Sequence, residues 1–424
     1  MPPLTPRQMR GGSPARARID ALLDADSFVE LDAFAGVGEA AARAVVGLGT
    51  IDGRDVALYA LTSGRDASLS EVTAAKIAKV QELALRSRVP LIAIDDSAGE
   101  PNEGLTALAG LAGICYRHVG ASGVVPQLGV VLGAATPVSA LMDLVFVVSE
   151  KGRRLTSPDH PADEGGRGPG VSPGAAHLVA EDEAECWRAV RAVLSHLPSH
   201  SGEAPPFQPA ADPSDRGDAA LQTLVPESAD GQYDMREVVT RLLDDGRFLE
   251  VQPFFAQNVL VGFGRLGGHV AGVVANQPRV LAGALDAAAS GKAARFVRLC
   301  DAFNVPLVSL VDTPGSPAGT AHGVALLRAY AEATVPKLAV ITRRAVGDAY
   351  ATMSPKQLGA DLNLAWPSAE IGDAVAGPYA AAERGHVDAV IEPRETRRAL
   401  VRSLELCVHR TVEPPSRRHT SIPL

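Results

Sequence analysis

Hydrophobic and polar residues follow the same order twice along this chain. Residues 91–94 are a short, wholly apolar run typical of a buried strand, and residues 307–311 form a similar run interrupted only by Ser309. Each run is introduced by Val-Pro and followed by an Asp-(Ser/Thr)-x-Gly turn. A stretch with apolar residues at helical spacing precedes each run, and Lys76 and Lys292 stand thirteen residues before the respective valines. Because the two copies keep an equal spacing of 216 residues, the pattern predicts two copies of one αβ unit.

The repeat extends beyond these strands. An amphipathic segment, a pair of short alternating runs typical of a hairpin, and a second buried strand occur in each half. These paired segments are residues 15–34 and 233–251, residues 43–61 and 259–275 with turns at Asp52-Gly53 and Gly267-Gly268, and residues 128–132 and 338–342. Repeated alternation of helix and buried strand favours an α/β layered core in each half.

Length and composition agree with two domains. The chain has 424 residues, of which 46% are hydrophobic, which is enough to bury two cores. Residues 198–232 are rich in proline, serine, alanine and aspartate and lack periodicity, so they are interpreted as a linker. We therefore expect an N-terminal domain at residues 15–197 and a C-terminal domain at residues 233–410.

Charge and cysteine content narrow the class of protein. A net charge of −9 disfavours non-specific nucleic-acid binding, and no apolar run is long enough for a membrane span. The N-terminus lacks the apolar core of a signal peptide, so a cytoplasmic location is expected. Four cysteines lie far apart without a CxxC pair, which predicts neither a metal site nor a disulfide framework.

Candidate chemistry lies in the loops that follow the buried strands. Small residues at a helix entrance let a carbonyl approach the backbone, and two converging N–H groups can form an oxyanion hole. A tight packing contact is the alternative interpretation, but a matching loop in each half favours function. These loops are Gly133-Ala134-Ala135-Thr136 and Gly347-Asp348-Ala349.

Several segments carry a family resemblance. They are YDMREVV, FLEVQPFFAQNVLVGFGRLGG, VANQPRVLAGALD, KAARFVRLCDAFNVPLVSLVDTPG and AYAEATVPKLAVITRRAVGDAY. They resemble the carboxyltransferase (β) subunits of acyl-CoA carboxylases such as the propionyl-CoA enzymes. The resemblance covers residues 15–408 and is strongest over residues 233–372.

The resemblance implies two tandem crotonase-like (ββα spiral) domains related by internal duplication. It also implies that the N-terminal half binds an acyl-CoA, while the C-terminal half of a neighbouring subunit binds carboxybiotin. The expected assembly is a homo- or hetero-hexamer of β-type subunits, supplied by a separate biotin carboxylase and biotin carrier subunit.

The family's site residues transfer by motif. The biotin-side hole falls at Gly347-Asp348-Ala349 and the thioester-side hole at Gly133-Ala134-Ala135-Thr136. Coenzyme A contacts fall at Ser68, at Ser97-Ala98-Gly99 and, in the second copy of the turn, at Gly315. The implied reaction passes through a thioester enolate, so the protein stabilises oxyanions and needs no side-chain nucleophile.

The chain also departs from the family pattern. Asp348 replaces the second glycine of a Gly-Gly-Ala motif, and the thioester-side loop is shorter and lacks its Gly-Gly pair. A carboxylate about 4 Å from a developing oxyanion costs about 4 kcal/mol at an effective dielectric of 20. Three functions therefore stay open: an acyl-CoA carboxyltransferase, a biotin-independent decarboxylase of a malonyl-type thioester, and a non-catalytic paralogue that assembles with an active β subunit.

Three further residues have simpler interpretations. Lys292 and Arg295 lie one helical turn apart and are expected to be exposed cations of an amphipathic helix, with phosphate binding as the alternative. His177 is interpreted as a hydrogen-bonded structural histidine rather than a catalytic one.

Overall fold

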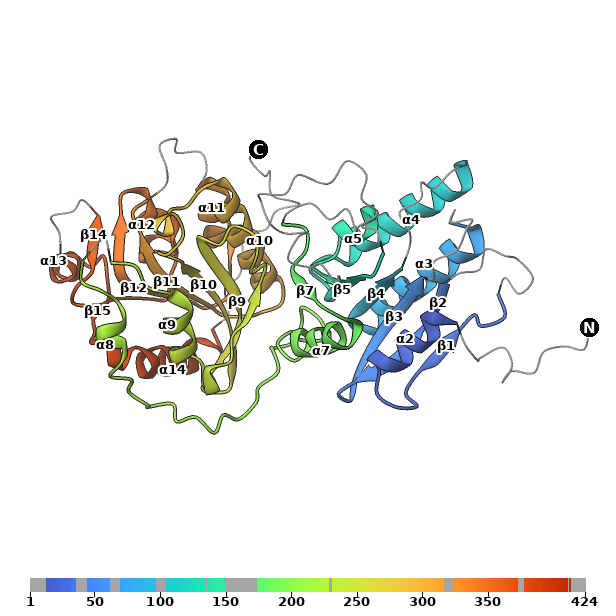
Figure 1. Ribbon diagram of the computed structural model, residues 1–424, viewed down its shortest axis with the longest axis horizontal. Coiled ribbons are helices and arrows are strands. Elements are labelled where there is room, and N and C mark those ends of the chain that lie inside the picture. Colours follow the sequence, from blue (N-terminus) through green and yellow to red (C-terminus); the bar gives the residue numbers. More distant parts are fainter. Residues whose placement is uncertain are drawn as a thin grey trace, which may run out of the picture. The chain divides into compact units, whose positions relative to one another are not determined.

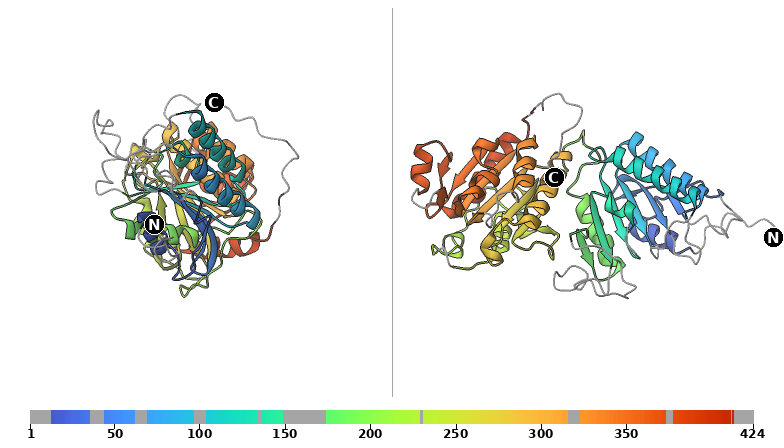
Figure 2. Two further views of the ribbon diagram at one scale, coloured as in Figure 1. Left: turned by 90° about the vertical axis from the view of Figure 1, so that its right-hand side faces the viewer. Right: turned by 90° about the horizontal axis from the view of Figure 1, so that it is seen from above.

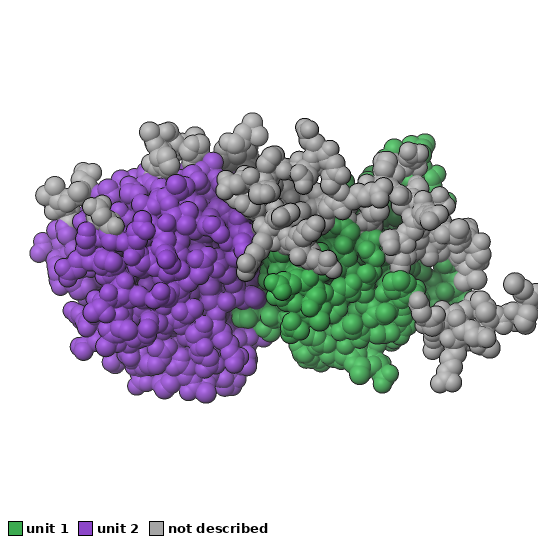
Figure 3. Space-filling view, viewed as in Figure 1, with its two compact units in different colours: residues 1–203 green, residues 204–424 purple. Residues whose placement is uncertain are grey.

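The computed structural model of the chain consists of two compact units, Met1–Glu203 (unit 1) and Ala204–Leu424 (unit 2). Figure 3 colours the two units separately. The structure describes residues 13–35, 44–61, 69–96, 104–133, 136–148, 174–228, 231–315, 323–372, 377–410 and 412. The division between the units falls within the segment predicted as a linker, and the domain limits given above stay a prediction.

Unit 1 is built on a seven-stranded sheet in the order β1-β2-β3-β4-β5-β6-β7. The first two pairs are antiparallel and the remaining pairs are parallel. Helix α3 packs on one face through Ile77, Val80 and Ala84, while Leu23 after α2 contacts Gly49 from the other face (Figure 1). The elements are α2 (Pro14–Leu22), β1 (Val29–Leu31), β2 (Ala44–Ile51), β3 (Arg54–Leu61), α3 (Glu71–Ser87), β4 (Leu91–Asp95), α4 (Leu105–Ala121), β5 (Gln127–Val131), α5 (Pro137–Ala140), β6 (Leu144–Val148), β7 (Leu178–Ala180) and α7 (Glu183–Leu194).

Unit 2 repeats this plan with eight strands in the order β15-β13-β12-β11-β10-β9-β8, while β14 pairs with β12. Helix α10 covers one face of the sheet, and α9 and α14 share a core with the other face (Figure 2). The elements are α8 (Leu221–Leu224), α9 (Met235–Leu242), η1 (Asp244–Gly246), β8 (Leu249–Val251), β9 (Val259–Leu266), β10 (His269–Asn276), η2 (Leu281–Gly283), α10 (Ala287–Ala302), β11 (Leu307–Thr313), α11 (Val324–Glu332), β12 (Lys337–Val346), α12 (Asp348–Thr352), η3 (Lys356–Leu358), β13 (Leu362–Ala365), β14 (Glu370–Gly372), α13 (Pro378–Glu383), β15 (Ala389–Val390), η4 (Pro393–Glu395) and α14 (Thr396–Cys407).

The predicted duplication is confirmed down to individual contacts. A Cβ on Gly49 would lie 2.4 Å from Leu23 Cδ1, and a Cβ on Gly264 would lie 2.5 Å from Leu243 Cδ1. At such distances a side chain would have to displace the neighbouring leucine, which fills the space above each strand. Equivalent glycines therefore allow the residue after the helix to pack closely on the hairpin in both units.

A polar clamp is also duplicated. Asp24 accepts hydrogen bonds from the backbone N–H groups of the β2–β3 turn, and Asp244 does the same for the β9–β10 turn. Arg191 from α7 and Arg397 from α14 each pair with the respective aspartate. Each arginine also donates to the carbonyl oxygen of the last residue of the helix before the first strand, which is Leu22 of α2 or Leu242 of α9. Each hairpin turn is thus tied to that helix and to α7 or α14.

The segment with linker-like composition is largely packed on unit 2. It contains the short helix α8, and Leu221 and Val225 lie buried in the unit 2 core. Earlier in the segment, the Gln208 N–H donates to the Gly268 carbonyl oxygen in the β9–β10 turn. The sequence signal for this packing was the spacing of Leu221 and Val225, two apolar residues one helical turn apart. None of the helices in the described part of the chain combines the length and the apolar character of a membrane span.

Candidate functional site

The predicted biotin-side loop lies at the carboxyl end of β12, beside the carboxyl end of β11. The two strands are parallel neighbours, so Gly315 after β11 and Gly347 after β12 emerge at one edge of the sheet. Asp348 begins α12 and its Oδ1 atom lies 3.0 Å from the position a Cβ on Gly315 would occupy. The structure therefore brings Gly315 together with Asp348, and Ala349 follows in the same helix.

Gly315 is held in a conformation that requires glycine. Its φ of +112° lies in a region that side chains rarely adopt. Its N–H donates to Thr313 Oγ1 at 3.2 Å, and its carbonyl oxygen accepts from the Leu285 N–H at 3.3 Å. Both polar groups of this turn are thus used in fixing it, and the Asp348 carboxylate stands over its Cα.

Beneath this edge lies a buried carboxylate that holds two arginines. Asp312, at the end of β11, is fully buried and accepts from Arg343 Nε at 2.9 Å and from Arg344 Nε at 3.0 Å. The Tyr233 hydroxyl donates to the same carboxylate at 2.8 Å. Burial, and then the Asp312 charge, raise the pKa of Tyr233 well above its usual value, so the hydroxyl remains a donor.

The Asp312 network extends to the loops around the site. Arg343 donates to the carbonyl oxygens of Ser228 and Gly231, and Arg344 donates to that of Ala282 in η2. The network joins the ends of β11 and β12 to the η2 turn. Since two guanidinium groups share one carboxylate here, positive charge predominates in this group of three side chains.

Lys292 was expected to be an exposed cation, and this prediction is wrong. The side chain is buried, and Nζ donates to the carbonyl oxygens of Gln252, Phe255 and Val259 at 2.8 to 2.9 Å. Burial lowers the pKa of the Lys292 ammonium to about 7. The physical reason is that the β8–β9 connection needs a buried donor for its inward-facing carbonyls. The Lys292 ammonium is therefore used by backbone carbonyls and is not exposed for a phosphate, whereas Arg295 is exposed as predicted.

In unit 1, the described part of the thioester-side loop is already engaged. The Gly133 N–H donates to the Asp95 carbonyl oxygen at 3.4 Å. The Thr136 N–H donates to Ser139 Oγ at 3.0 Å, and Thr136 Oγ1 donates to the Asp95 carboxylate at 3.1 Å. Thr136 is thus the N-cap of α5 in a capping box. Gly133 and Thr136 support the loop, so an oxyanion hole here depends on the two alanines between them.

Those two alanines, and most of the predicted coenzyme A contacts, lie outside the described residues. They are Ala134, Ala135, Ser68, Ser97, Ala98 and Gly99. The adjacent Asp96 is described: it accepts from Arg18 Nη1 at 2.7 Å, and Arg18 Nε donates to Glu183. Burial alone would lower the pKa of Arg18, but hydrogen bonds to Glu183 and Asp96 raise it, so the guanidinium stays charged.

Other features agree with structural interpretations. His177 is buried, and its Nδ1 accepts from the Val145 N–H at 3.0 Å, as expected for a structural histidine. The described residues contain no cluster of three or more His, Cys, Asp or Glu side chains that could hold a metal ion. The sequence interpretation missed the roles of Tyr233, Arg343 and Arg344. The signal was present, since two adjacent arginines in an otherwise apolar strand need a buried acid.

The chain matches a family model described as "Carboxyl transferase domain" over residues 6–375 and 372–422. The chain therefore belongs to the carboxyl transferase family. A relative, the biotin-dependent acetyl-/propionyl-coenzyme A carboxylase beta5 subunit of Mycobacterium tuberculosis (strain CDC 1551 / Oshkosh), is 41% identical over 496 residues, covering 98% of this chain and 90% of the relative. That alignment is longer than this 424-residue chain, so the relative has segments that this chain lacks.

A second relative carries out a different reaction by name. The methylmalonyl-CoA decarboxylase subunit alpha of Veillonella parvula is 37% identical over 396 residues, covering 81% of this chain and 78% of the relative. Among solved structures, a transcarboxylase 12S hexamer with hydrolysed methylmalonyl-coenzyme A bound has a TM-score of 0.88 and 34% identity, covering 99% of this chain and 94% of that one. The predicted family and the two-part α/β fold are confirmed by these likenesses.

Proposed function

We propose that the chain is the carboxyltransferase subunit of an acyl-CoA carboxylase, which places a carboxyl group on the α-carbon of a short acyl-CoA. The observation that carries this proposal is the likeness, over 99% of the chain, to a transcarboxylase with hydrolysed methylmalonyl-coenzyme A bound. Relatives named for acetyl-CoA and propionyl-CoA carboxylation point to the same substrate class. A cytoplasmic location is part of the proposal and rests on sequence alone.

The chemistry assigned to this chain is stabilisation of an enolate by backbone N–H groups. In unit 1, Ala134 and Ala135 would face the thioester oxygen, since the N–H groups of Gly133 and Thr136 are already engaged. Ser68 and the Ser97-Ala98-Gly99 turn would contact coenzyme A. Carboxybiotin, brought by a separate carrier subunit, would supply CO2 and the base that removes the α-proton.

Some features of the unit 2 loops suit a biotin ureido group, and one feature opposes it. The Gly315 turn and the loop from Gly347 to Ala349 supply small residues at the end of two parallel strands, which suits close approach of a planar ring. The Asp348 carboxylate standing over Gly315 acts against a developing oxyanion at the same place. A biotin-side hole at Gly347-Asp348-Ala349 therefore needs this carboxylate protonated or turned away when carboxybiotin binds.

An oligomer is part of the same proposal. Helix α4 exposes a stripe of large apolar side chains, with Leu105 84%, Leu108 51%, Tyr116 79% and Val119 61% exposed. Their spacing places them on one side of the helix, and a folded monomer seldom leaves such a continuous apolar face in water. A hexamer is described for the transcarboxylase relative. Burial of α4 against another β-type subunit is the corresponding expectation here, with biotin carboxylase and carrier subunits as further partners.

The direct test is incorporation of labelled bicarbonate. Purified chain is combined with biotin carboxylase, biotinylated carrier and ATP, and acetyl-CoA, propionyl-CoA and longer acyl-CoAs are offered in turn. Labelled carboxyacyl-CoA that depends on every component is expected. A folded sample that fails with all of these substrates, but restores activity to a related β subunit when mixed with it, would mean that the chain is a non-catalytic partner.

A second candidate is a biotin-independent decarboxylase of a malonyl-type thioester. The presence of Asp348 in the candidate loop favours it, because a carboxyl group can act as a general acid toward an enolate. Release of CO2 from methylmalonyl-CoA without any biotin component would support this function, and Asp348→Asn would then slow the release. Faster carboxylation in Asp348→Gly would instead support the first proposal, since the variant removes a repulsive charge.

A further inference from the structure

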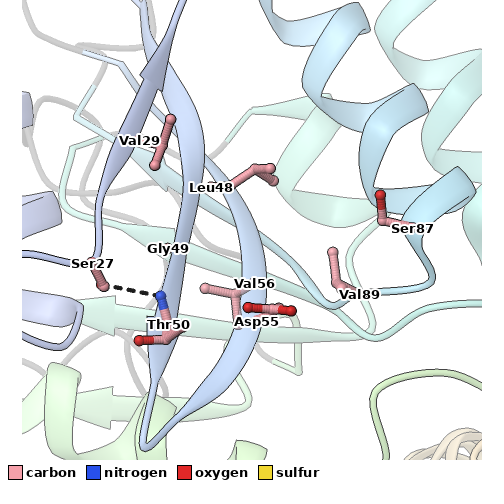
Figure 4. A pocket seen from close by; sticks show the side chains of 9 residues that line it. All are labelled: Ser27, Val29, Leu48, Gly49, Thr50, Asp55, Val56, Ser87 and Val89. Atoms are coloured by element: carbon pink, nitrogen blue, oxygen red, sulfur yellow. Dashed lines mark hydrogen bonds between the residues drawn. The ribbon is translucent and has the colours of Figure 1, made fainter.

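Unit 1 contains a cavity of about 240 Å³, half open to solvent, at the edge opposite the candidate site. The cavity lies at the end of β2 and at the beginnings of β3 and β4. Asp95 and Gly133, which belong to the predicted thioester side, lie at the carboxyl ends of the parallel strands β4 and β5. The cavity is therefore independent of the proposed carboxyl transfer. Its lining residues, drawn in Figure 4, are Ser27, Val29, Leu48, Gly49, Thr50, Asp55, Val56, Ser87 and Val89.

The duplication supplies a filled version of the same place. Leu48 pairs with Ala57 in unit 1 as Phe263 pairs with Gly272 in unit 2, which makes Leu48 and Phe263 equivalent. The turns after the helices also match, because Arg88 and Asn304 have φ values of +55° and +57°. From these registers, Ser87 corresponds to Phe303 and Asp55 corresponds to Val270.

In unit 2 the equivalent volume is closed by apolar side chains. Phe263 and Phe303 are fully buried, and Val270 is 2% exposed. The Phe263 ring lies 5.1 Å from that of Phe296 on α10, in a tilted pair. Unit 1 has the smaller Leu48, Ser87 and Val80 where unit 2 has three phenylalanines. The common frame accommodates aromatic rings at this place, and unit 1 leaves their space open.

The charged residue in the cavity lining is Asp55. Ser27 Oγ accepts from the Thr50 N–H at 3.1 Å and donates to the Asp24 carbonyl oxygen at 2.8 Å, so it is already paired (Figure 4). Asp55 forms no ion pair with any residue that the structure describes. Asp55 thus stands at the rim of the cavity where unit 2 has Val270, and phenylalanine rings fill the equivalent space of unit 2. These two features favour a ligand that has a ring and a positive charge.

We propose that this cavity binds a small molecule that carries a phenyl-sized ring and a protonated amine, with the ring against Leu48 and Val89 and the ammonium group at Asp55. An apolar cavity of roughly 150 Å³ accepts benzene. The volume of about 240 Å³ has room for a ring with a short alkyl amine. Ser87, at the end of α3, supplies a hydroxyl beside the ring.

The experiment measures binding of three probes of one size to the full chain by protein-observed NMR and calorimetry. They are 2-phenylethylammonium, neutral 2-phenylethanol and anionic phenylacetate. Tightest binding of the ammonium probe and weakest binding of phenylacetate are expected. Asp55→Asn should weaken ammonium binding roughly fivefold, as an exposed ion pair allows, and leave 2-phenylethanol unchanged. No binding of the ammonium probe at millimolar concentration, or equal binding of phenylacetate, overturns the proposal.

Variants copied from unit 2 test the location of the site. Ser87→Phe should abolish binding of all three probes, while Ser87→Ala, its matched control, should retain binding. Leu48→Phe is a second filling variant in case Ser87→Phe does not fold, as judged by circular dichroism. Undiminished binding in a folded filling variant would place the ligand elsewhere and overturn the proposal. Since none of these residues lies at the candidate site, the rate of carboxyl transfer should be unchanged.

Discussion

The two units share a backbone plan but differ in how they hold charge at the edge where the site is expected. In unit 2, Asp312 is fully buried and binds two arginines and a tyrosine. In unit 1 the residue 216 positions earlier, Asp96, has a side chain 21% exposed and binds Arg18, which is 17% exposed and also binds Glu183. The ionic network of unit 2 is largely buried, whereas that of unit 1 is partly exposed to solvent.

This difference shows which parts of a duplicated fold diverge. The close contacts of Gly49 and Gly264 with their leucines are the same in both units because the hairpin and the helix end have only one way to pack. The edges are free to change, since loops contribute little to the core. Unit 2 thus has a buried ionic support beneath Gly315 and Asp348, where the proposed reaction places a planar ring.

The largest expected effect is that of Asp312→Ala. The substitution leaves Arg343 as a buried charge without its counterion, which destabilises a protein by about 3–5 kcal/mol. Urea unfolding followed by circular dichroism measures the loss. The matched variant in unit 1, Asp96→Ala, should cost less than about 1 kcal/mol, because its partner can turn to water. Equal losses in the two variants would show that the two edges are held alike.

Lys292→Met is expected to cost about 3 kcal/mol, since it strands the carbonyl oxygens that accept from Nζ. It should also change the pH dependence of stability. The pKa of Lys292 is about 7 in the folded chain against an ordinary 10.5, so the unfolded chain binds more protons between these values. The contribution of Lys292 to the free energy of unfolding is therefore complete above pH 10.5 and lost as pH falls to about 7. Urea midpoints across this range should rise less steeply in the variant; an unchanged slope would exclude a low pKa.

Gly315→Ala should destabilise the chain by about 2 kcal/mol, because an alanine resists the φ of +112° and its Cβ would meet Asp348 Oδ1 at 3.0 Å. In the double variant with Asp348→Gly, the stability lost through the contact with Asp348 should be recovered. The stability lost through the unfavourable φ should not be recovered. Gly53→Ala in the unit 1 hairpin turn is the control, since it has a φ of +75° and no atom within 4 Å. A cost for Gly315→Ala no greater than for the control would mean that Asp348 does not lie over this turn.

Much of the fold was predictable because the two halves repeat. The buried strands beginning at Leu91 and Leu307 and the turn at Gly267-Gly268 follow from apolar runs and glycine pairs, which are local signals. The packing of residues 204–228 on unit 2 was not predictable from composition. It depends on Leu221 and Val225 finding a core built by residues far along the chain.

The candidate loops were predictable as turns that follow buried strands, while their role as a site stays a prediction. The pairing of parallel strands places Gly315 and Gly347 at one edge of the sheet. Which N–H groups are already used could not be foreseen, because the bond from Gly133 to Asp95 depends on the approach of two loops. Lys292 was misjudged for the same reason: helical spacing gives its face but not the carbonyl oxygens that converge on that face from another loop.

The smallest effect is expected at the clamp that both units share. In unit 1 a hydrogen bond from the Gly53 N–H contributes most to lowering the pKa of Asp24 to about 2, and Thr50, Asp52 and Arg191 add to it. Because this pKa lies below the ordinary 3.8, the stabilisation is complete above pH 3.8 and is lost as pH falls through about 2. Asp24→Asn should therefore cost about 1 kcal/mol near neutral pH and flatten the acid limb of the stability curve.

The corresponding change in unit 2, Asp244→Asn, sharpens the comparison. Its partner Arg397 is 1% exposed, against 27% for Arg191, so the same substitution strands a buried guanidinium instead of a half-solvated one. Urea unfolding near neutral pH should show the larger loss for Asp244→Asn even though both aspartates receive the same turn N–H groups. If the two variants lose the same stability, then the turn hydrogen bonds and not the burial of the arginine decide the strength of the clamp, and the contrast between the units is confined to the edge at Asp312.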